Sequence, residues 1–178
     1  MDTTQKQLKT NIVLIGMAGA GKSTVGKELA RLCGLGFVDV DTVIEKDQNI
    51  ALQELLNSLG AQGFRSLEEK ILLSLDYKNH VIAPGGSAIY SHAGMEHLKK
   101  TALLVLLDVP LTLLEQRVGD FSARGLVKSS GQSFKQLFDE RQPLYAKHAD
   151  LTIECIDRSV SDICMSIKNQ VSDTFYHL

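Results

Sequence analysis

The chain has 178 residues, of which 44% are hydrophobic and 22% charged, and its formal net charge is -2. This composition suits one soluble domain with a sizeable core, and the lack of a basic block, with 6% aromatic residues and no tryptophan, argues against a nucleic-acid-binding surface. The polar N-terminal residues lack the apolar stretch of a signal peptide, and no later segment is long enough to span a membrane, so we expect a cytoplasmic protein without a membrane partner.

Short apolar runs alternate with longer segments of helical period, which is typical of βαβ units around a parallel sheet. Residues 1–10 are polar and predict a loose N-terminal tail. The run NIVLI at 11–15 predicts the first strand, and the helix after it should end at Gly34, because glycine is favoured just beyond helix C-termini. GFVDVD at 36–41 predicts a second strand.

The middle of the chain continues this alternation. Two helical stretches at 51–59 and 63–75 precede a third predicted strand, HVIA, at 80–83. The run TALLVLLDV at 101–109 is apolar without alternation, as expected for a central parallel strand covered on both faces. Residues 111–118 predict another helix.

The last part of the chain begins with a segment that has no apolar period. Residues 119–133 hold three glycines and four serines, a composition that favours a mobile functional loop over packed structure. A helix over 134–141 is expected to stop near Pro143. LTIEC at 151–155 predicts the last strand, and Ser159 is the expected N-cap of a final helix.

The first chemical motif lies between the first strand and the first helix. Residues 16–23, GMAGAGKS, fit the pattern G-x-x-x-x-G-K-[ST] in the context that a phosphate-binding P-loop requires. In such a loop the backbone N–H groups surround phosphates at a helix N-terminus, Lys22 reaches the terminal phosphates and Ser23 can bind Mg²⁺. The alternative, a glycine turn without a function, would not account for the lysine and the serine at these positions. A Rossmann dinucleotide site does not fit, because Thr24 occupies the third glycine position.

Two carboxylates follow at the end of the second predicted strand. Asp39 and Asp41 lie two residues apart, so both point to the same side if both belong to the strand. This edge of an open α/β sheet is where ligands bind, and one carboxylate could hold Mg²⁺ through water while the other faces the attacking group. The alternative is that Asp41 only caps a helix beginning at Thr42.

Three arginines are candidates for anion binding. Arg65 has Glu68 and Glu69 at i+3 and i+4, so its spacing alone favours an ordinary surface ion pair. Arg124 lies in the glycine–serine segment, where a mobile arginine could close over the γ-phosphate and stabilise the transition state. A solvated loop charge is the alternative for Arg124. Arg141 follows in the sequence DERQPLY.

A glycine pair follows the third predicted strand, in PGGS at 84–87. Such a pair forms a tight turn or lets a ligand approach the main chain. Pro84 biases Ala83 toward extended backbone, which would deliver the glycines to the end of the strand. Ser87 would cost about 1 kcal/mol if its φ is positive, and otherwise adds a hydroxyl to the site.

The cysteines and two large aromatic residues are assigned to the core. Cys33, Cys155 and Cys164 contain no CxxC pair and have no histidines at metal-ligand spacing, so we expect reduced thiols. Phe64 and Tyr145 are expected to pack in the core and not to stack on a ligand.

In combination the motifs resemble the shikimate kinase family, within the nucleoside-monophosphate-kinase branch of P-loop proteins. They occur in the family's order over about residues 11–170: GMAGAGKST, DVD, FRSLEE, PGGSA, an arginine pair in and before the lid, and RQPLY. The resemblance implies an α/β, three-layer P-loop kinase fold with a central five-stranded parallel sheet flanked by helices. It also implies a single domain at 11–178, with a substrate-binding region at about 41–75 and a mobile lid at 119–133.

The resemblance implies Mg²⁺-dependent transfer of the ATP γ-phosphate to a hydroxyl of shikimate, in the pathway to chorismate and the aromatic amino acids, by an enzyme that we expect to be a monomer. The implied catalytic residues are Lys22, Asp41 and Arg124. The implied nucleotide-binding residues are Gly19, Ala20, Gly21, Lys22, Ser23, Thr24, Arg117 and Arg124. The implied substrate-binding residues are Asp41, Arg65, Gly85, Gly86, Ser87 and Arg141. Ser23 and water-linked Asp39 are the implied metal ligands.

Two positions depart from the family pattern. Ser87 stands where the family usually has a third glycine, and Gly125 stands where it usually has proline. Both fall near the substrate or the transferred phosphate. Two alternatives therefore stay open: a kinase of the same fold acting on another small hydroxy acid such as gluconate, and a non-catalytic nucleotide-binding module.

Overall fold

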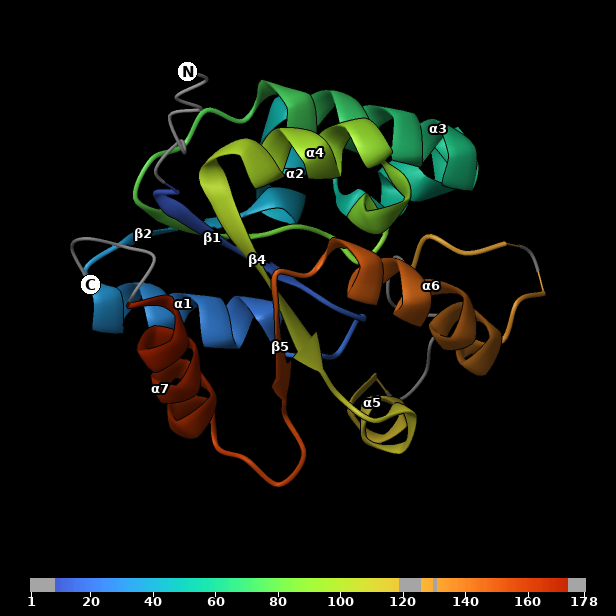
Figure 1. Cartoon of the computed structure of the whole chain (residues 1–178). Coiled ribbons are helices and arrows are strands. Elements are labelled where there is room, and N and C mark those ends of the chain that lie inside the picture. The colour runs from blue at the N-terminus through green and yellow to red at the C-terminus, as the bar shows by residue number, and fades with distance from the viewer. Residues whose placement is uncertain (1–8, 119–125, 130, 173–178) are drawn as a thin grey trace, which may run out of the picture.

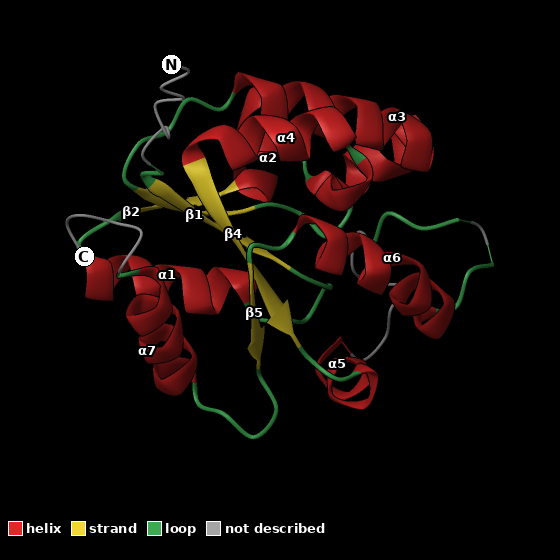
Figure 2. Ribbon diagram, viewed as in Figure 1, coloured by secondary structure: helices red, strands yellow, loops and turns green. Residues whose placement is uncertain are grey.

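The structure is a computed structural model that describes residues 9–118, 126–129 and 131–172. Its centre is a five-stranded sheet in the order β2-β3-β1-β4-β5, in which every neighbouring pair is parallel (Figures 1 and 2). The strands are β1 (Asn11–Ile15), β2 (Gly36–Asp39), β3 (His80–Ala83), β4 (Ala102–Asp108) and β5 (Leu151–Glu154). The predicted parallel sheet of five strands is confirmed.

Helices cover both faces of the sheet, as the three-layer prediction requires (Figure 2). On one face α1 (Lys22–Cys33) packs against α7 (Val160–Val171), and on the other α3 (Leu52–Ser74) packs against α4 (His92–Thr101). The remaining elements are α2 (Val40–Gln48), the 3-10 helix η1 (Ala88–Tyr90), α5 (Leu111–Val118) and α6 (Phe134–His148). No helix of the described residues combines the length and apolarity that crossing a membrane requires.

The sequence rules for strands and helix ends hold at several positions. Every residue of β1 is buried, because this strand lies inside the sheet with helices on both faces. Gly34 ends α1 in the left-handed conformation at φ 66°, and Ser159 begins α7 with a capping box. The two predicted helices at 51–59 and 63–75 are joined in α3 and separated by a break at Gly60 (φ 66°, ψ 176°).

The end of β2 differs from the prediction and changes the placement of two site residues. The strand stops at Asp39, whose side chain accepts a hydrogen bond from the Asp41 N–H and thereby caps α2. Asp41 therefore lies in the first turn of α2, and the prediction that both aspartates share one face of a strand is wrong. The alternative that Asp41 caps the helix is wrong as well, because Asp39 is the cap.

Two helices also differ from the sequence expectations. The prediction that a helix stops near Pro143 is wrong, because α6 continues through this proline to His148. Burial of Tyr145, two residues later at 1% exposure, favours the continued helix over the break that proline prefers. Helix α4 was not predicted, although Ser91 caps it and Met95 and Leu98 form its buried face.

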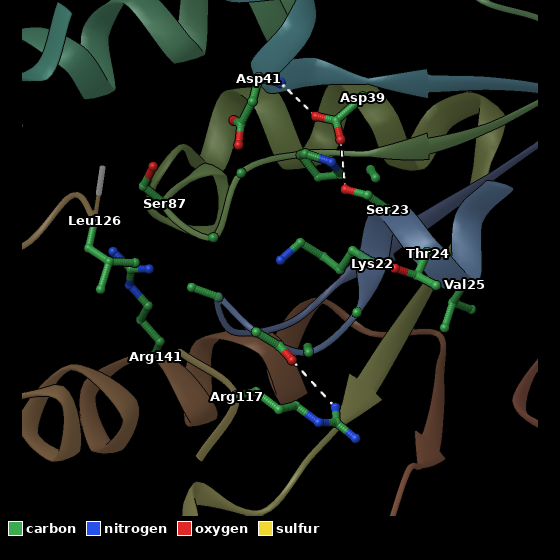
Figure 3. A pocket seen from close by; sticks show the side chains of 18 of the residues that line it. Lys22, Ser23, Thr24, Val25, Asp39, Asp41, Ser87, Arg117, Leu126 and Arg141 are labelled. Atoms are coloured by element: carbon green, nitrogen blue, oxygen red, sulfur yellow. Dashed lines mark hydrogen bonds between the residues drawn. The ribbon is translucent and has the colours of Figure 1, made fainter. Parts of the chain in front are cut away.

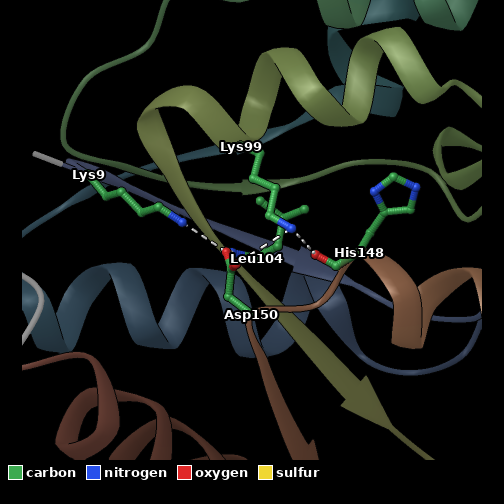
Figure 4. A network of polar contacts seen from close by, with 5 residues as sticks. All are labelled: Lys9, Lys99, Leu104, His148 and Asp150. Atoms are coloured by element: carbon green, nitrogen blue, oxygen red, sulfur yellow. Dashed lines mark hydrogen bonds and ion pairs between the residues drawn. The ribbon is translucent and has the colours of Figure 1, made fainter. Parts of the chain in front are cut away.

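The beginning of the described chain is attached to the edge of β4 and β5 through Asp150 (Figure 4). One carboxylate oxygen of Asp150 accepts hydrogen bonds from Lys9 Nζ and from the Leu104 N–H, both at 3.0 Å. Lys99 Nζ lies 3.7 Å from the other oxygen. The Thr10 N–H also donates to the Thr101 carbonyl at 2.9 Å. Residues 9 and 10 are thus fixed to the sheet, whereas the rest of the predicted tail lies outside the described residues.

Candidate active site

A cavity of about 540 Å³ lies where β1, β2 and β3 reach their C-terminal ends (Figure 3). The loops after these strands bring the P-loop, the two aspartates and the glycine pair to its wall. Helix α6 contributes Arg141 from the opposite side. The cavity is lined by the predicted residues Gly19, Ala20, Gly21, Lys22, Ser23, Thr24, Asp39, Asp41, Gly85, Gly86, Ser87, Arg117 and Arg141.

The P-loop has the backbone that its glycines permit. Gly19 and Gly21 have φ of 84° and 91°, a region that other residues rarely adopt, and α1 begins directly afterwards at Lys22. Lys22 Nζ donates to the carbonyls of Gly16 at 2.8 Å and Met17 at 3.1 Å. Burial lowers the pKa of Lys22 to about 8, against the opposing effect of Asp41. A phosphate in the loop would offer this desolvated ammonium a stronger partner than two carbonyls.

Ser23 and Asp39 lie in contact beside the P-loop. Ser23 Oγ donates to Asp39 Oδ2 at 2.6 Å, and the other oxygen of Asp39 accepts the Asp41 N–H at 3.2 Å. Among the described residues no group of three or more His, Cys, Asp or Glu side chains could enclose a metal ion. One hydroxyl and one carboxylate instead fit Mg²⁺, which commonly takes one or two protein oxygens and completes its ligands with water and phosphate.

Gly85 lies between the half-buried carboxylate of Asp41 and the buried carboxylate of Glu68. A β-carbon at Gly85 would stand 2.8 Å from Asp41 Oδ1 and 2.7 Å from Glu68 Oε1, so any larger residue there would require both carboxylates to shift. Burial raises the pKa of Asp41 to about 6, with a further contribution from the negative charge of Asp39. Burial also raises the pKa of Glu68 to about 7, against the lowering effect of the Ser87 hydroxyl. Burial thus favours the protonated form of both carboxyl groups.

Ser87 has ordinary backbone geometry and a buried hydroxyl. Its φ of -84° and ψ of -14° remove the possibility that serine is strained at this position. Its Oγ donates to Glu68 Oε2 at 2.6 Å, and the side chain is 4% exposed. The departure from glycine thus adds a hydroxyl that already donates its hydrogen bond to Glu68.

Arg141 is a buried cation without a carboxylate partner. It is 1% exposed, donates to the Val127 carbonyl and to the Tyr90 hydroxyl, and takes part in no ion pair between described residues. Its Nη1 lies 3.0 Å from the point where a β-carbon of Gly86 would stand, so the guanidinium faces the glycine loop. A buried charge is costly unless paired, which makes this position suited to an anionic ligand.

Arg65 lies on the other side of this wall. Its guanidinium centre is 3.7 Å from the centre of the Tyr90 ring, to which Arg141 also comes within 5.2 Å. Arg65 lines a neighbouring polar cavity with Glu68, Ser87 and Tyr90 and does not line the main one. The surface ion pair suggested by the spacing of Arg65 is absent among the described residues, so that prediction is wrong. Glu68 and Glu69 instead accept hydrogen bonds from the hydroxyls of Ser87 and Ser91.

Of the remaining predicted residues, the structure describes Arg117 but not Arg124 or Gly125. Arg117 is exposed and reaches the P-loop, where its Nη1 lies 3.4 Å from the Gly19 carbonyl (Figure 3). Arg124 and Gly125 lie outside the described residues, as does most of the predicted lid. Their predicted roles therefore stay predictions.

Sequence reasoning missed Glu68 and Tyr90 and gave Tyr145 only a core role. Tyr145 is buried as predicted, but its hydroxyl also donates to the Gly86 carbonyl at 2.7 Å. The sequence signal for Glu68 was its i+3 spacing from Arg65, which places both on one face of α3. That spacing predicted an ion pair between the two and not a contact with the site. The contacts to Ser87 and Tyr90 join segments far apart in the sequence and follow from no local pattern.

The chain is similar to known proteins over most of its length. The family model described as shikimate kinase matches residues 18–172. The shikimate kinase of Persephonella marina is 34% identical over 162 residues, which are 90% of this chain and 98% of that protein. The shikimate kinase of Thermodesulfovibrio yellowstonii is 38% identical over 150 residues, which are 83% of this chain and 84% of that protein.

A solved structure gives the same result. Shikimate kinase from Acinetobacter baumannii, in complex with shikimate, superposes with a TM-score of 0.83 at 34% identity. The superposition covers 94% of this chain and 96% of that one.

Proposed function

Because the chain belongs to the shikimate kinase family, we propose that it transfers the γ-phosphate of ATP to a hydroxyl of shikimate. The observation that carries this proposal for the acceptor is Arg141, a buried guanidinium that lines the cavity and has no carboxylate partner among the described residues. Shikimate has a carboxylate, and a guanidinium can bind one through two parallel charge-assisted hydrogen bonds. The opposite wall offers Asp41, which can accept a hydrogen bond from a hydroxyl of the same molecule.

The residues divide into a phosphate side and an acceptor side. Gly19 and Gly21 shape the P-loop that would hold the ATP phosphates, and Lys22 would leave its two carbonyl partners to bind the terminal phosphates. Asp41 would align the acceptor hydroxyl and accept its proton as the new bond to phosphorus forms. Phosphoryl transfer is largely dissociative, so we expect the alignment to contribute more than base strength.

The rest of the predicted site belongs to the same proposal. Gly85 and Gly86 would let the acceptor ring lie against the main chain. Arg65, which lies near Tyr90 with Arg141 but does not line the main cavity, would have to turn toward it to join Arg141 at the acceptor carboxylate. Arg124 would stabilise the charge of the transferred phosphate from the lid, and Arg117 would stack on adenine. Ser23 and Asp39 would hold Mg²⁺, which supplies positive charge to the phosphate oxygens of ATP.

The test is a coupled assay of ADP formation by the purified protein with ATP, Mg²⁺ and shikimate. Gluconate, other small hydroxy acids and nucleoside monophosphates serve as competing acceptors, and omission of Mg²⁺ tests the metal. We expect turnover with shikimate at least about 100-fold above the hydrolysis of ATP alone. Turnover with another acceptor only, or with none, would contradict the proposal and favour the gluconate-type kinase or the nucleotide-binding module respectively.

We also propose a monomer that works in the cytoplasm. The three cysteines are free thiols, and Cys155 and Cys164 are buried, which fits a reducing compartment. Size-exclusion chromatography with light scattering tests the monomer. A mass near 19.5 kDa supports it and a multiple of that mass contradicts it.

A further inference from the structure

The buried guanidinium of Arg141 is held by the protein at two of its three nitrogens. Its Nε donates to the Tyr90 hydroxyl at 3.3 Å, and its Nη2 donates to the Val127 carbonyl. A guanidinium has five N–H groups, so both of those on Nη1 and one on Nη2 have no partner among the described residues. Nη1 is also the nitrogen that faces Gly86. The two contacts therefore leave the side of the guanidinium beside the glycine loop available for a ligand.

The Tyr90 hydroxyl is in turn oriented by a carboxylate. Tyr90 is the last residue of η1, which follows the glycine pair, and its hydroxyl donates to Glu140 Oε1 at 2.6 Å. A phenol has one proton, so with this proton directed at Glu140 the oxygen meets Arg141 Nε as an acceptor. The other oxygen of Glu140 accepts from Gln132 Nε2, also at 2.6 Å, which fixes the carboxylate as well.

We propose that Tyr90 is a positioning residue for the acceptor, whose hydroxyl holds the Arg141 guanidinium in the orientation that binds the acceptor carboxylate. Tyr90 does not line the main cavity, so it acts through Arg141 and not by contact with the acceptor. Glu140 supports this contact by accepting the Tyr90 proton in a hydrogen bond. The inference rests on the proposed function, because it takes Arg141 to bind an anionic acceptor.

Ordering of Arg141 before the acceptor arrives is the physical reason for an effect on affinity. An arginine side chain has many rotamers, and a ligand that must immobilise it loses part of the binding free energy. Contacts at both Nε and Nη2 fix the plane of the Arg141 guanidinium, whereas the Val127 contact alone would let the plane rotate. A carboxylate is bound best by two parallel N–H groups, so a rotated plane binds it less well.

The kinetic test is Tyr90→Phe, which removes only the hydroxyl and keeps the ring on which the Arg65 guanidinium lies at 3.7 Å. We expect the KM for shikimate to rise roughly three- to tenfold, while kcat and the KM for ATP stay within about twofold. Tyr77→Phe is the matched control, because the Tyr77 hydroxyl has no hydrogen bond to another described residue, and neither KM should change. An unchanged or lowered KM for shikimate in Tyr90→Phe would overturn the inference.

A double-mutant cycle establishes whether the effect passes through Arg141. In Arg141→Met the guanidinium is absent, so adding Tyr90→Phe should change the KM for shikimate by less than about twofold. The same rise in both backgrounds would mean that Tyr90 acts independently of Arg141 and would overturn the inference. Thermal unfolding of each variant establishes that it is folded before its kinetics are compared.

A second cycle tests the support from Glu140. Because Glu140 is exposed, we expect Glu140→Ala to raise the KM for shikimate by only about two- to threefold, and to add nothing in Tyr90→Phe. Asp139→Ala is the matched control, since this neighbouring carboxylate on α6 pairs with Lys135 at 2.5 Å and should not affect the KM. Additive effects of Glu140→Ala and Tyr90→Phe would contradict the orienting role of Glu140.

A substrate-free measurement separates this inference from the proposed function. ¹H–¹⁵N NMR of the arginine Nε–H groups follows Arg141, with Arg141→Met providing the assignment. A buried, hydrogen-bonded N–H exchanges slowly with water, so we expect exchange at least about tenfold faster in Tyr90→Phe. Equal exchange rates would show that Tyr90 does not hold Nε and would overturn the inference. If the wild type did not phosphorylate shikimate, the proposed function would fail while this exchange still decided the contact between Tyr90 and Arg141.

Discussion

The hydroxyl of Tyr145 donates a 2.7 Å hydrogen bond to the carbonyl oxygen of Gly86, which joins α6 to the loop after β3. The same helix carries Arg141, whose Nη1 lies 3.0 Å from the position of a Gly86 β-carbon. Helix α6 thus positions both the main chain and the guanidinium on this side of the proposed acceptor site. This contact depends on the continuation of α6 beyond Pro143.

The first prediction concerns Tyr145→Phe. The Gly86 carbonyl would lose its donor in a buried setting, so the free energy of unfolding should fall by about 1 kcal/mol. The KM for shikimate should rise a few-fold because the glycine loop is less firmly held. Urea unfolding and steady-state kinetics measure the two effects. Tyr77→Phe is the control, because the Tyr77 hydroxyl has no hydrogen bond to another described residue, and equal losses in both variants would refute the role of the contact.

Gly85→Ala tests the close approach of two carboxylates to the main chain. The added methyl would stand 2.8 Å from Asp41 Oδ1 and 2.7 Å from Glu68 Oε1, so both carboxylates must move. We expect kcat/KM for shikimate to fall on the order of 100-fold, because a misplacement of about 1 Å at reacting groups has this effect. ATP affinity, measured by isothermal titration calorimetry, should stay within about threefold because the P-loop is not displaced. Near wild-type turnover of shikimate would contradict this geometry.

The sheet and the P-loop could be predicted because local patterns determine them. The apolar run at 101–109 has no alternation and becomes a buried central strand, and the glycine and lysine spacing at 16–23 specifies a phosphate-binding loop by itself. The P-loop, the two aspartates and the glycine pair came together because each follows a parallel strand, and the C-terminal ends of parallel strands share one edge. Arg141 joins them from helix α6.

The wrong predictions concern positions where a single residue at an element boundary, or a contact between segments distant in sequence, determines the structure. The placement of Asp41 depends on where β2 ends. The Asp39 side chain accepts a hydrogen bond from the Asp41 N–H, so β2 stops at Asp39 and Asp41 lies in a helix. Helical spacing predicted Glu68 as the partner of Arg65, but Ser87, 19 residues further along the chain, binds Glu68 instead. The course of α6 through Pro143 likewise depends on buried contacts of Tyr145 that no local pattern contains.

Asp41→Asn tests the raised pKa of Asp41 through stability. The folded protein holds this proton up to about pH 6, whereas an unfolded aspartate loses it near its ordinary value of 3.8. Between these values the folded state binds more protons, so the stability of the wild type falls as the pH rises from about 4 to 6 and stays lower above that. An amide has no such titration. At about pH 8 Asp41→Asn should therefore be more stable, by on the order of 1–2 kcal/mol, with the difference vanishing near pH 4.

Thermal unfolding as a function of pH measures this difference, and Asp76→Asn provides the control at an exposed carboxylate. The same Asp41→Asn protein should lose most of its turnover of shikimate, mainly because the amide no longer aligns the acceptor hydroxyl as the carboxylate does. A lower stability than the wild type at about pH 8 would show that the Asp41 charge is not destabilising in the ligand-free protein.

Arg141→Met separates binding from folding at the most buried charge of the proposed site. Methionine keeps much of the apolar volume and removes a cation that has no ion-pair partner in the described structure, so the free energy of unfolding should change by less than about 1 kcal/mol. The KM for shikimate should rise on the order of 100-fold, because a charge-assisted contact to its carboxylate is lost, while the KM for ATP stays nearly constant.

Arg31→Met is the control, since Arg31 is exposed and paired with Glu28 at 2.8 Å, and neither KM should change. Chemical unfolding and steady-state kinetics with both substrates measure these quantities. A large loss of stability with an unchanged KM for shikimate would assign Arg141 to the fold and remove it from the acceptor site.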